Sequence, residues 1–188
     1  MGSNAKVFSL LHWWENLSGA WQHALADNLE LMAPPQLADL EQLFQLTELD
    51  LSGSAIDELS PLLIMSQLTK LDLSDTRVVD LSLLQQIPEL RELHMVCSQG
   101  IKVGDLAQLQ KLEVLDVSYP VVPLVGSLSL LENLDSLREL YCNACDLTDV
   151  ISVIGLDRLH TLSLSFNRIP SLEIQVLAEL NPLCRILN

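Results

Sequence analysis

Residues 46–59 read LTELDLSGSAIDEL, and the phrase returns as LTKLDLSDTRVVDL at residues 68–81 and as LHTLSLSFNRIPSL at residues 159–172. The spacings between successive copies are 22, 22, 22, 25, 22 and 21 residues when the copies are aligned on their first leucine, which is Leu46, Leu68, Leu90, Leu112, Leu137, Leu159 and Leu180. A nearly constant period of this length indicates stacked repeats, because one such unit cannot bury its own apolar face.

Apolar residues recur at fixed places within each repeat, counted from that first leucine. They fall at places 1, 4, 6, 11, 14, 17 and 20, as in Leu68, Leu71, Leu73, Val78, Leu81, Leu84 and Ile87. The L-x-L at places four and six predicts a short strand with both leucines facing inward. The later leucines, three residues apart, predict a 3₁₀ or short α segment that returns along the other side.

Repeats of this length with D-L-x-x-L after the strand, as at Asp80, Leu81 and Leu84, resemble the leucine-rich-repeat family. The likeness is to its bacterial internalin-like and phosphatase-regulator-like subclass, and it covers residues 36–188 in six to seven repeats. The resemblance implies an α/β fold: a right-handed, curved solenoid with a parallel β-sheet on the concave face and short 3₁₀ or α segments on the convex face. We expect residues 1–188 to form a single domain.

Residues 1–35 carry apolar side chains at helical spacing and predict an α-helical cap. Ser18 is placed to cap the second helix, and Pro34-Pro35 to end it. The stretch also holds all three tryptophans, Trp13, Trp14 and Trp21. An aromatic cluster can cradle a ligand, but covering the open end of the first repeat is the favoured interpretation.

Three features depart from the repeat pattern. The family usually has asparagine at place nine, where its amide bonds neighbouring backbones, but this chain has Ser54, Thr76, Ser98, Pro120, Cys145 and Asn167. Because proline lacks a donor, we expect irregularity in the fourth repeat, which also carries extra residues over 121–129. In the third repeat Gly100-Ile101 shifts an apolar place by one. In the last repeat Arg185 falls on an inward place, which predicts a truncated closing coil with an exposed apolar end.

Charge limits the classes of partner. The chain has 25 acidic and 10 basic residues, a net charge of −15. Such a charge repels nucleic-acid phosphates and anionic membranes, so we expect a protein as the partner and neither of these. The favoured interpretation is that the acidity keeps the chain soluble, and the alternative is that it attracts a partner of basic character. No apolar run is long enough to span a bilayer. The four cysteines form no disulfide framework, which fits a cytoplasmic setting.

Residues that flank the inward leucines of each strand point to the concave face. An acidic column, Asp50, Asp72 and Asp116, occupies the fifth place, and His94 and Tyr141 share it. Tyr119 and Phe166 occupy the eighth place and Asn143 the seventh. The candidate partner-binding set is His94, Asp116, Tyr119, Tyr141, Asn143, Phe166, Asp50 and Asp72.

The same residue types are compatible with two other kinds of chemistry. The carboxylates of the acidic column could hold Ca²⁺ or act as a general acid and base, but no calcium-loop motif is present, and a solvated acidic face is favoured. Cys142 and Cys145 have the spacing of a zinc half-site or redox pair, yet the repeat register places both in the core. No catalytic motif is found, and neither a metal nor a cofactor is expected.

The sequence therefore predicts a non-catalytic scaffold that binds a protein on its concave sheet. One alternative is an acidic inhibitor or regulatory subunit of an enzyme. The other is a small-ligand-binding or enzymatic role that uses His94, Tyr119 and Tyr141, which would need a closed pocket.

Overall fold

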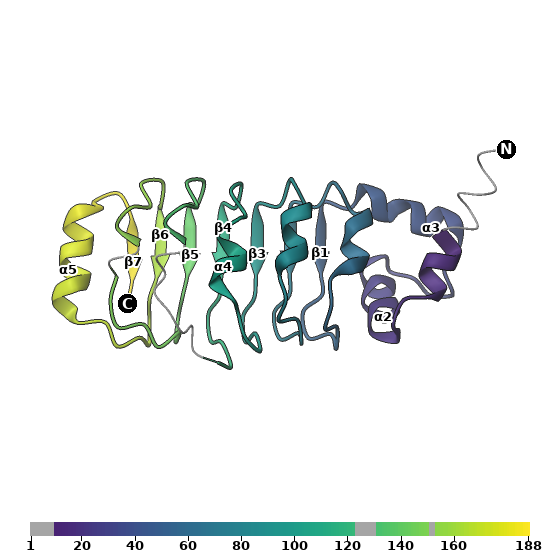
Figure 1. Ribbon diagram of the computed structural model, residues 1–188, viewed down its shortest axis with the longest axis horizontal. Coiled ribbons are helices and arrows are strands. Elements are labelled where there is room, and N and C mark those ends of the chain that lie inside the picture. The colour runs from purple at the N-terminus through teal and green to yellow at the C-terminus, as the bar shows by residue number, and fades with distance from the viewer. Residues whose placement is uncertain (1–9, 123–130, 151–152) are drawn as a thin grey trace.

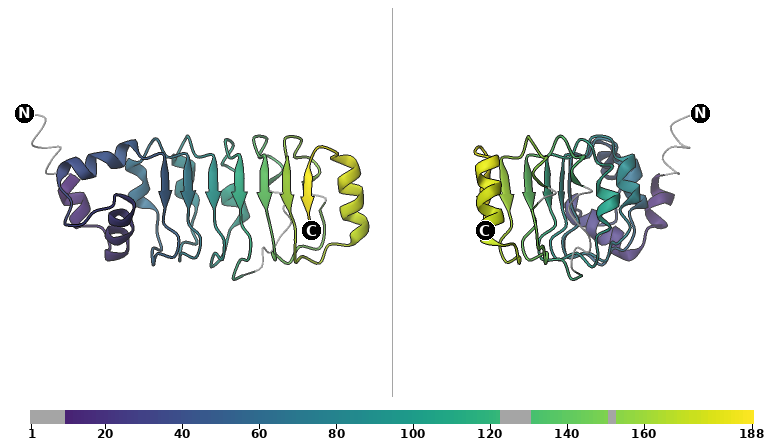
Figure 2. Two further views of the ribbon diagram at one scale, coloured as in Figure 1. Left: turned by 180° about the vertical axis from the view of Figure 1, so that it is seen from behind. Right: turned by 60° about the vertical axis from the view of Figure 1, so that its left-hand side comes forward.

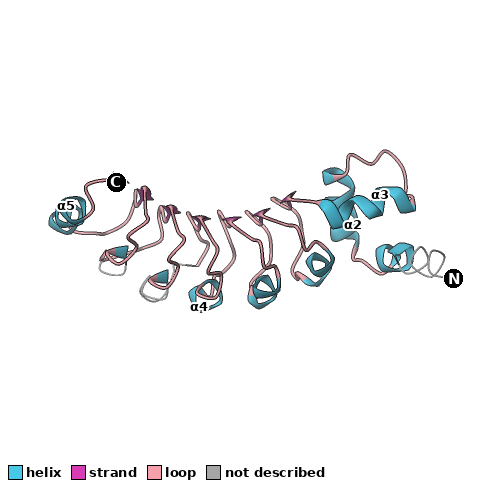
Figure 3. Ribbon diagram, turned by 90° about the horizontal axis from the view of Figure 1, so that it is seen from above, coloured by secondary structure: helices cyan, strands magenta, loops and turns pink. Residues whose placement is uncertain are grey.

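A computed structural model describes residues 10–122, 131–150 and 153–188 of the 188-residue chain. Seven short strands form one parallel sheet in chain order (Figure 1). Their bounds are β1 Glu48–Asp50, β2 Lys70–Asp72, β3 Glu92–His94, β4 Val114–Asp116, β5 Glu139–Tyr141, β6 Thr161–Ser163 and β7 Arg185–Leu187. The sheet is curved, with the strands along its concave side and short helical segments along its convex side (Figure 3). These segments include η2 Ser60–Ile64, η3 Ser82–Gln86 and α4 Val103–Leu106.

The fourth-place leucine lies at the centre of each of the first six strands, as the sequence predicts. Leu49 pairs with Leu71, Leu71 with Leu93, and the register continues unbroken through β6. These leucines are buried while the residues on either side of them are half-buried or exposed, except Ser163 in β6, which is buried. The two faces of each strand are therefore divided between core and solvent.

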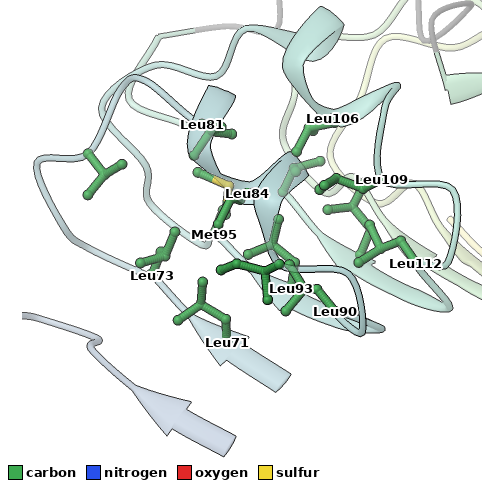
Figure 4. Close-up of a cluster of buried hydrophobic side chains, with 14 of the residues drawn as sticks. Leu71, Leu73, Leu81, Leu84, Leu90, Leu93, Met95, Leu106, Leu109 and Leu112 are labelled. Atoms are coloured by element: carbon green, nitrogen blue, oxygen red, sulfur yellow. The ribbon is translucent and has the colours of Figure 1, made fainter. Parts of the chain in front are cut away.

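The core is one continuous cluster that runs from the N-terminal helices to the last repeat. Sheet residues such as Leu71, Leu73 and Met95 point into the core (Figure 4). There they face Leu81 and Leu84, which come from the segment on the convex side. Burial of each leucine contributes about 1.5–3 kcal/mol, and every repeat supplies several. Each repeat buries its apolar side chains against those of the next repeat, and this burial stabilises such short strands.

The N-terminal end is covered by helices. Residues 10–15 are helical and are followed by α2 Gly19–Asn28, whose N-cap Ser18 accepts a 3.3 Å hydrogen bond from the Trp21 backbone N–H. The Trp21 side chain is only 1% exposed, and its indole Nε1 donates to the Glu58 carbonyl at 3.1 Å. The tryptophan thus covers the apolar end of the first repeat.

Pro34-Pro35 does not end α2, contrary to the sequence prediction. The helix stops at Asn28, and Glu30 takes a left-handed conformation with φ of 52°. The prolines follow in the connection to α3 Leu37–Glu41 and η1 Gln42–Gln45, which lead into β1. Figures 1 and 2 show α2 and α3 at one end of the elongated molecule and α5 Ser171–Leu180 at the other.

The last repeat differs from the prediction in register. Ile186 pairs with Leu162, so the repeat begins at Leu183 rather than Leu180, and Arg185 lies beside Thr161 on the concave face. The inward assignment of Arg185 was wrong because α5 has ten residues, longer than the return segments of the other repeats. The exposed apolar end is present: Leu172, Leu180 and Leu183 are 71%, 58% and 89% exposed. No described helix is long and apolar enough to cross a membrane.

The ninth-place column forms only part of the expected ladder. Asn167 bridges two repeats, since its Nδ2 donates to the carbonyls of Cys142 and Leu164 at 2.7 and 2.8 Å. Its Oδ1 accepts the N–H groups of Cys145 and Leu147 at 3.0 Å each. One asparagine thereby satisfies four backbone groups across a repeat boundary.

The serine and threonine hydroxyls of the ninth-place column form fewer hydrogen bonds than Asn167 does. Ser54 donates to the Leu51 carbonyl at 2.6 Å and Thr76 to the Leu73 carbonyl at 2.7 Å, both within their own repeats. The oxygen Oγ of Ser98 is buried, and within the described residues it has no hydrogen-bond partner. The ladder is therefore interrupted there.

The irregular repeats keep the sheet intact. β4 stays in register with both of its neighbours although Pro120 follows it closely. The backbone N–H of Val121 donates to the Ser98 carbonyl at 2.9 Å. Residues 123–129 of the predicted insertion lie outside the described residues. Ile101 packs against the core, in agreement with the shifted apolar place.

A candidate protein-binding surface

The sheet register places the fifth-place residues side by side along the concave face. The row is Asp50, Asp72, His94, Asp116, Tyr141 and Ser163. Five of the eight predicted site residues therefore lie in one row across five strands. The third-place row beside it is Glu48, Lys70, Glu92, Val114, Glu139, Thr161 and Arg185. Because Arg185 lies on this face, the surface changes from acidic at β1 to basic at β7.

The three aspartates of the row share one local geometry. In each case Oδ1 accepts the backbone N–H two residues later: Asp50 from Ser52 at 2.9 Å, Asp72 from Ser74 at 2.8 Å and Asp116 from Ser118 at 2.9 Å. The hydrogen bonds from the side chain and backbone of Ser52 lower the pKa of Asp50. These carboxylates stabilise the turn that ends the strand, and they are held in place by it.

Glu92 joins two neighbours on the concave face. Its Oε1 lies 2.6 Å from Nζ of Lys70 and 2.7 Å from Nε2 of His94. Burial by itself would raise the pKa of Glu92, but the hydrogen bonds from His94 and Lys70 outweigh it and lower the pKa. His94 is therefore oriented by a carboxylate of its own strand.

Tyr141 has the same relation to Glu139. Its phenol donates to Oε2 of Glu139 at 2.7 Å. This hydrogen bond, with burial and the negative charges of Glu139 and Asp116, raises the pKa of Tyr141 to about 12. The ring is thus fixed on the sheet with its hydroxyl protonated near neutral pH.

Asn143 links three repeats. Its backbone N–H and its Nδ2 both donate to Oγ of Ser118 at 3.1 Å. Its Oδ1 accepts from Oγ of Ser163 at 2.7 Å and from the Ser165 N–H at 2.9 Å. These bonds give Asn143 a structural role that the sequence did not indicate, since the seventh place is otherwise mostly serine.

The eighth place forms a row at the carboxyl ends of the strands, which we call the rim. Every rim residue has a left-handed backbone, with φ from 53° to 67°: Gly53, Asp75, Cys97, Tyr119, Ala144 and Phe166. Tyr119 and Phe166 are 46% and 79% exposed. Their ring centroids lie 6.5 Å apart at an interplanar angle of 45° although they belong to repeats two apart.

Cys142 and Cys145 are fully buried, as the register predicts. Sγ of Cys145 donates to the Val117 carbonyl at 3.3 Å. A hydrogen bond with Cys145, together with burial, raises the pKa of the Cys142 thiol. Both side chains are therefore small groups of the core.

Sequence reasoning missed a network of charges at the other end of the strands. Glu113 bonds Arg91 at 2.6 Å and Arg138 at 3.3 Å, and Glu89 bonds Lys111 at 2.7 Å. The signal was available, because Arg91 and Glu113 are one 22-residue period apart, as are Glu89 and Lys111. The glutamates and the basic residues of this network neutralise one another. The excess of acidic residues in the chain therefore lies on other parts of the surface.

The concave face is hollowed at its N-terminal end. A hollow of about 300 Å³ is lined by Asn28, Glu48, Leu49, Asp50, Lys70 and Asp72. It contains four ionisable side chains, three of them carboxylates. None of His94, Tyr119 and Tyr141, the residues of the small-ligand alternative, lines it.

Known structures share this fold. No family model matches the chain, and no curated protein matches it. An internalin of Listeria monocytogenes (InlF) superposes with a TM-score of 0.67 and 18% identity over 90% of this chain, which spans 55% of that structure's length. Internalin C2 of the same species gives a TM-score of 0.61 and 19% identity, covering 89% of this chain and 92% of its own.

A leucine-rich-repeat protein of Leptospira interrogans gives a TM-score of 0.60 and 23% identity, covering 79% of this chain and 44% of its own. These likenesses agree with the seven-stranded parallel sheet, the convex helical segments and the 22-residue period. The chain has the leucine-rich-repeat solenoid fold of the bacterial internalin type.

Proposed function

We propose that the chain is a non-catalytic scaffold that binds a basic protein on its concave sheet. A solenoid of this kind is in general a protein-interaction scaffold. The observation that carries the more specific proposal is the row of Asp50, Asp72 and Asp116, each held by a backbone N–H. Carboxylates that are already ordered lose little conformational entropy when a cationic side chain binds them.

The charge of the surface supports a basic partner. On the first strand, Glu48 and Asp50 form no ion pair within the described residues, and Lys70 is drawn to Glu92. Uncompensated carboxylates accelerate association with a cationic partner and favour it over a neutral one. The same reasoning supports the narrower proposal that the chain is an inhibitor or regulatory subunit that covers a basic active site.

A catalytic or small-ligand role is less well supported. His94 and Tyr141 are each bonded to a glutamate of their own strand rather than to a nucleophile or to each other. The concave hollow lies at β1 and β2, away from both residues. Catalytic sites need a concave pocket in which such groups converge.

The experiment compares two variants of equal charge. The concave variant is Asp50→Asn, Asp72→Asn and Asp116→Asn, because asparagine keeps the oxygen that accepts the turn N–H while removing the charge. The control variant is Glu41→Gln, Asp157→Asn and Glu179→Gln, three exposed carboxylates outside the sheet. Partners captured from a lysate by the native chain are quantified against both variants over a range of salt concentrations.

We expect the concave variant to lose at least tenfold in apparent affinity and to show a weaker salt dependence, and the control variant to resemble the native chain. Equal losses in both variants would mean that net charge alone is responsible. Unchanged capture by the concave variant would refute the proposal. Circular dichroism of all three proteins verifies that they remain folded.

We also propose a reducing, cytoplasmic location, supported by the buried thiols of Cys142 and Cys145, which serve the core in their reduced form. Fractionation of the source cells tests it, because recovery of the chain from outside the cytoplasm would contradict it.

A further inference from the structure

The rim holds two aromatic side chains on strained backbone. Tyr119 and Phe166 have φ of 56° and 62°, a left-handed conformation that is costly for bulky residues. Gly53 occupies the same place in the first repeat, and glycine adopts this conformation without strain. Retention of strained residues is a reason to look for a function at that place.

The two rings also form one surface. They lie in the fourth and sixth repeats, and between them the fifth repeat has Ala144, whose small side chain leaves room for the contact. Their centroids are 6.5 Å apart, within the range of interacting aromatic pairs. Phe166 remains 79% exposed and Tyr119 46% exposed, so both aromatic residues are open to solvent. Val121, 60% exposed, follows Tyr119 closely in the chain.

Two carboxylates that form no ion pair among the described residues lie on β4 and β5, the strands next to this pair in the sheet. Asp116 is three residues before Tyr119, and it neighbours Tyr141 in the register of β4 and β5. Tyr141 in turn bonds Glu139. Neither Asp116 nor Glu139 forms an ion pair with any described residue: Arg138 and Arg168 are paired with Glu113 and Asp146, and Arg185 lies two strands from Glu139 in the third-place row. The aromatic pair thus follows strands β4 and β6, and the intervening part of the sheet carries two carboxylates without an ion-pair partner among the described residues.

We propose that Tyr119 and Phe166 form an anchor that takes an aliphatic or aromatic side chain of the partner, while Asp116 and Glu139 bind a cationic side chain of the same partner segment. The inference rests on the proposed function and specifies the partner chemistry: a basic segment with a large apolar residue. Buried aromatic side chains at the centre of an interface commonly supply most of its affinity. Arg185 on β7 repels cationic groups. We therefore expect the basic residues of the bound segment to lie over β4 and β5 rather than toward β7.

Selection from a random peptide library displayed on phage tests this without knowledge of the natural partner. Four immobilised proteins are compared: the native chain, the rim variant Tyr119→Asn and Phe166→Asn, the acid variant Asp116→Asn and Glu139→Gln, and the control Leu172→Asn. Asparagine tolerates the left-handed backbone, so the rim variant is expected to fold. Leu172 is 71% exposed and lies on α5, away from the rim, which makes it a matched exposed apolar residue.

We expect peptides selected on the native chain and on the control to combine a large apolar residue with at least one lysine or arginine. The rim variant should lose the apolar preference alone, and the acid variant the basic preference alone. Measured on synthetic versions of these peptides, affinity should fall at least tenfold in the rim variant with an unchanged salt dependence.

The alternative outcomes are distinct. Basic peptides without an apolar preference would overturn the anchor and leave the proposed function in place. Apolar peptides without a basic preference would retain the anchor and refute the basic partner. Peptides that bind the rim variant as well as the native chain, or no enrichment on any of the four proteins, would overturn the inference.

Discussion

Ser98 and Ser54 occupy the same place in different repeats and have opposite energetic roles. Ser54 donates to a carbonyl of its own repeat, and Ser98 is buried without a partner in the described part of the chain. A satisfied hydroxyl contributes to stability, whereas a buried unsatisfied one carries its desolvation cost uncompensated. The sequence showed the column but could not show this difference, because it depends on the exact orientation of each turn.

We therefore predict that Ser98→Ala raises the free energy of unfolding by about 1 kcal/mol, since it removes an unpaired polar atom. Ser54→Ala should lower it by about 1 kcal/mol, since it removes a donor that is in use. Urea denaturation of both variants measures the difference. A loss of stability in Ser98→Ala as large as that in Ser54→Ala would contradict this description of the column.

Tyr141 provides a second test at this scale. Its pKa of about 12 lies above the ordinary value of 10.0, so the folded chain holds the proton more tightly than the unfolded chain. The stability that this proton supplies is complete below pH 10 and is lost as the pH rises toward 12. Tyr119→Phe leaves Tyr141 as the single tyrosine, because the chain has two.

The phenolate absorbance of that variant should then report one midpoint near 12. Adding Glu139→Gln should lower the midpoint, because the negatively charged acceptor of the phenol hydrogen bond is gone. Far-ultraviolet circular dichroism at each pH verifies that the chain is folded where the absorbance is read. An identical midpoint with and without Glu139 would show that the hydrogen bond does not hold the phenol.

Among the elements, β1 has an unusual edge. It is the first strand of the sheet, and exposed edge strands are sites of unwanted pairing with other chains. Asn28, at the end of α2, closes this edge: its Nδ2 donates to the Asp50 carbonyl at 2.5 Å and its Oδ1 accepts the Asp50 N–H at 2.9 Å. The amide thus imitates the backbone of a neighbouring strand.

Asn28→Ala should cost about 1–2 kcal/mol of stability, since both bonds to β1 are lost. It should also promote concentration-dependent association, because the edge is then open. Sedimentation velocity over a range of concentrations measures the association, with Asn16→Ala as a control asparagine whose side chain hydrogen-bonds to His12. A variant that associates no more than this control would indicate that the edge is protected by other means.

The elements also show where sequence reasoning succeeded and where it failed. Repeats built on L-x-L were predicted in register because each inward leucine must meet the next. The last repeat was misplaced because the leucines of α5, such as Leu172 and Leu180, fit the repeat pattern as well as they fit a helix. Leu177 alone in α5 is buried, and the sequence does not reveal which leucine of the segment contacts the core.

At the scale of the whole molecule, the repeated inward leucines determine the shape of the solenoid. The residues between them determine the charge and the apolar groups exposed on its concave face. The acidic row was predictable from the period, because residues 22 apart lie on adjacent strands. The contact between Tyr119 and Phe166 was not predictable, since it spans two repeats and depends on curvature and on the left-handed rim. Nor was the structural use of Asn143, which depends on hydroxyls from two neighbouring repeats.

The most direct test of the central claim is hydroxyl-radical footprinting of the chain, alone and bound to the partner captured in the charge-variant experiment. We expect protection of His94, Tyr119, Tyr141 and Phe166 in the complex. Met32, which is 99% exposed, and Leu172 and Leu183, at the far end, should react equally in both states. Protection of those three residues, with unchanged oxidation of the concave and rim residues, would contradict the claim that the variable side chains of the sheet and its rim carry the binding.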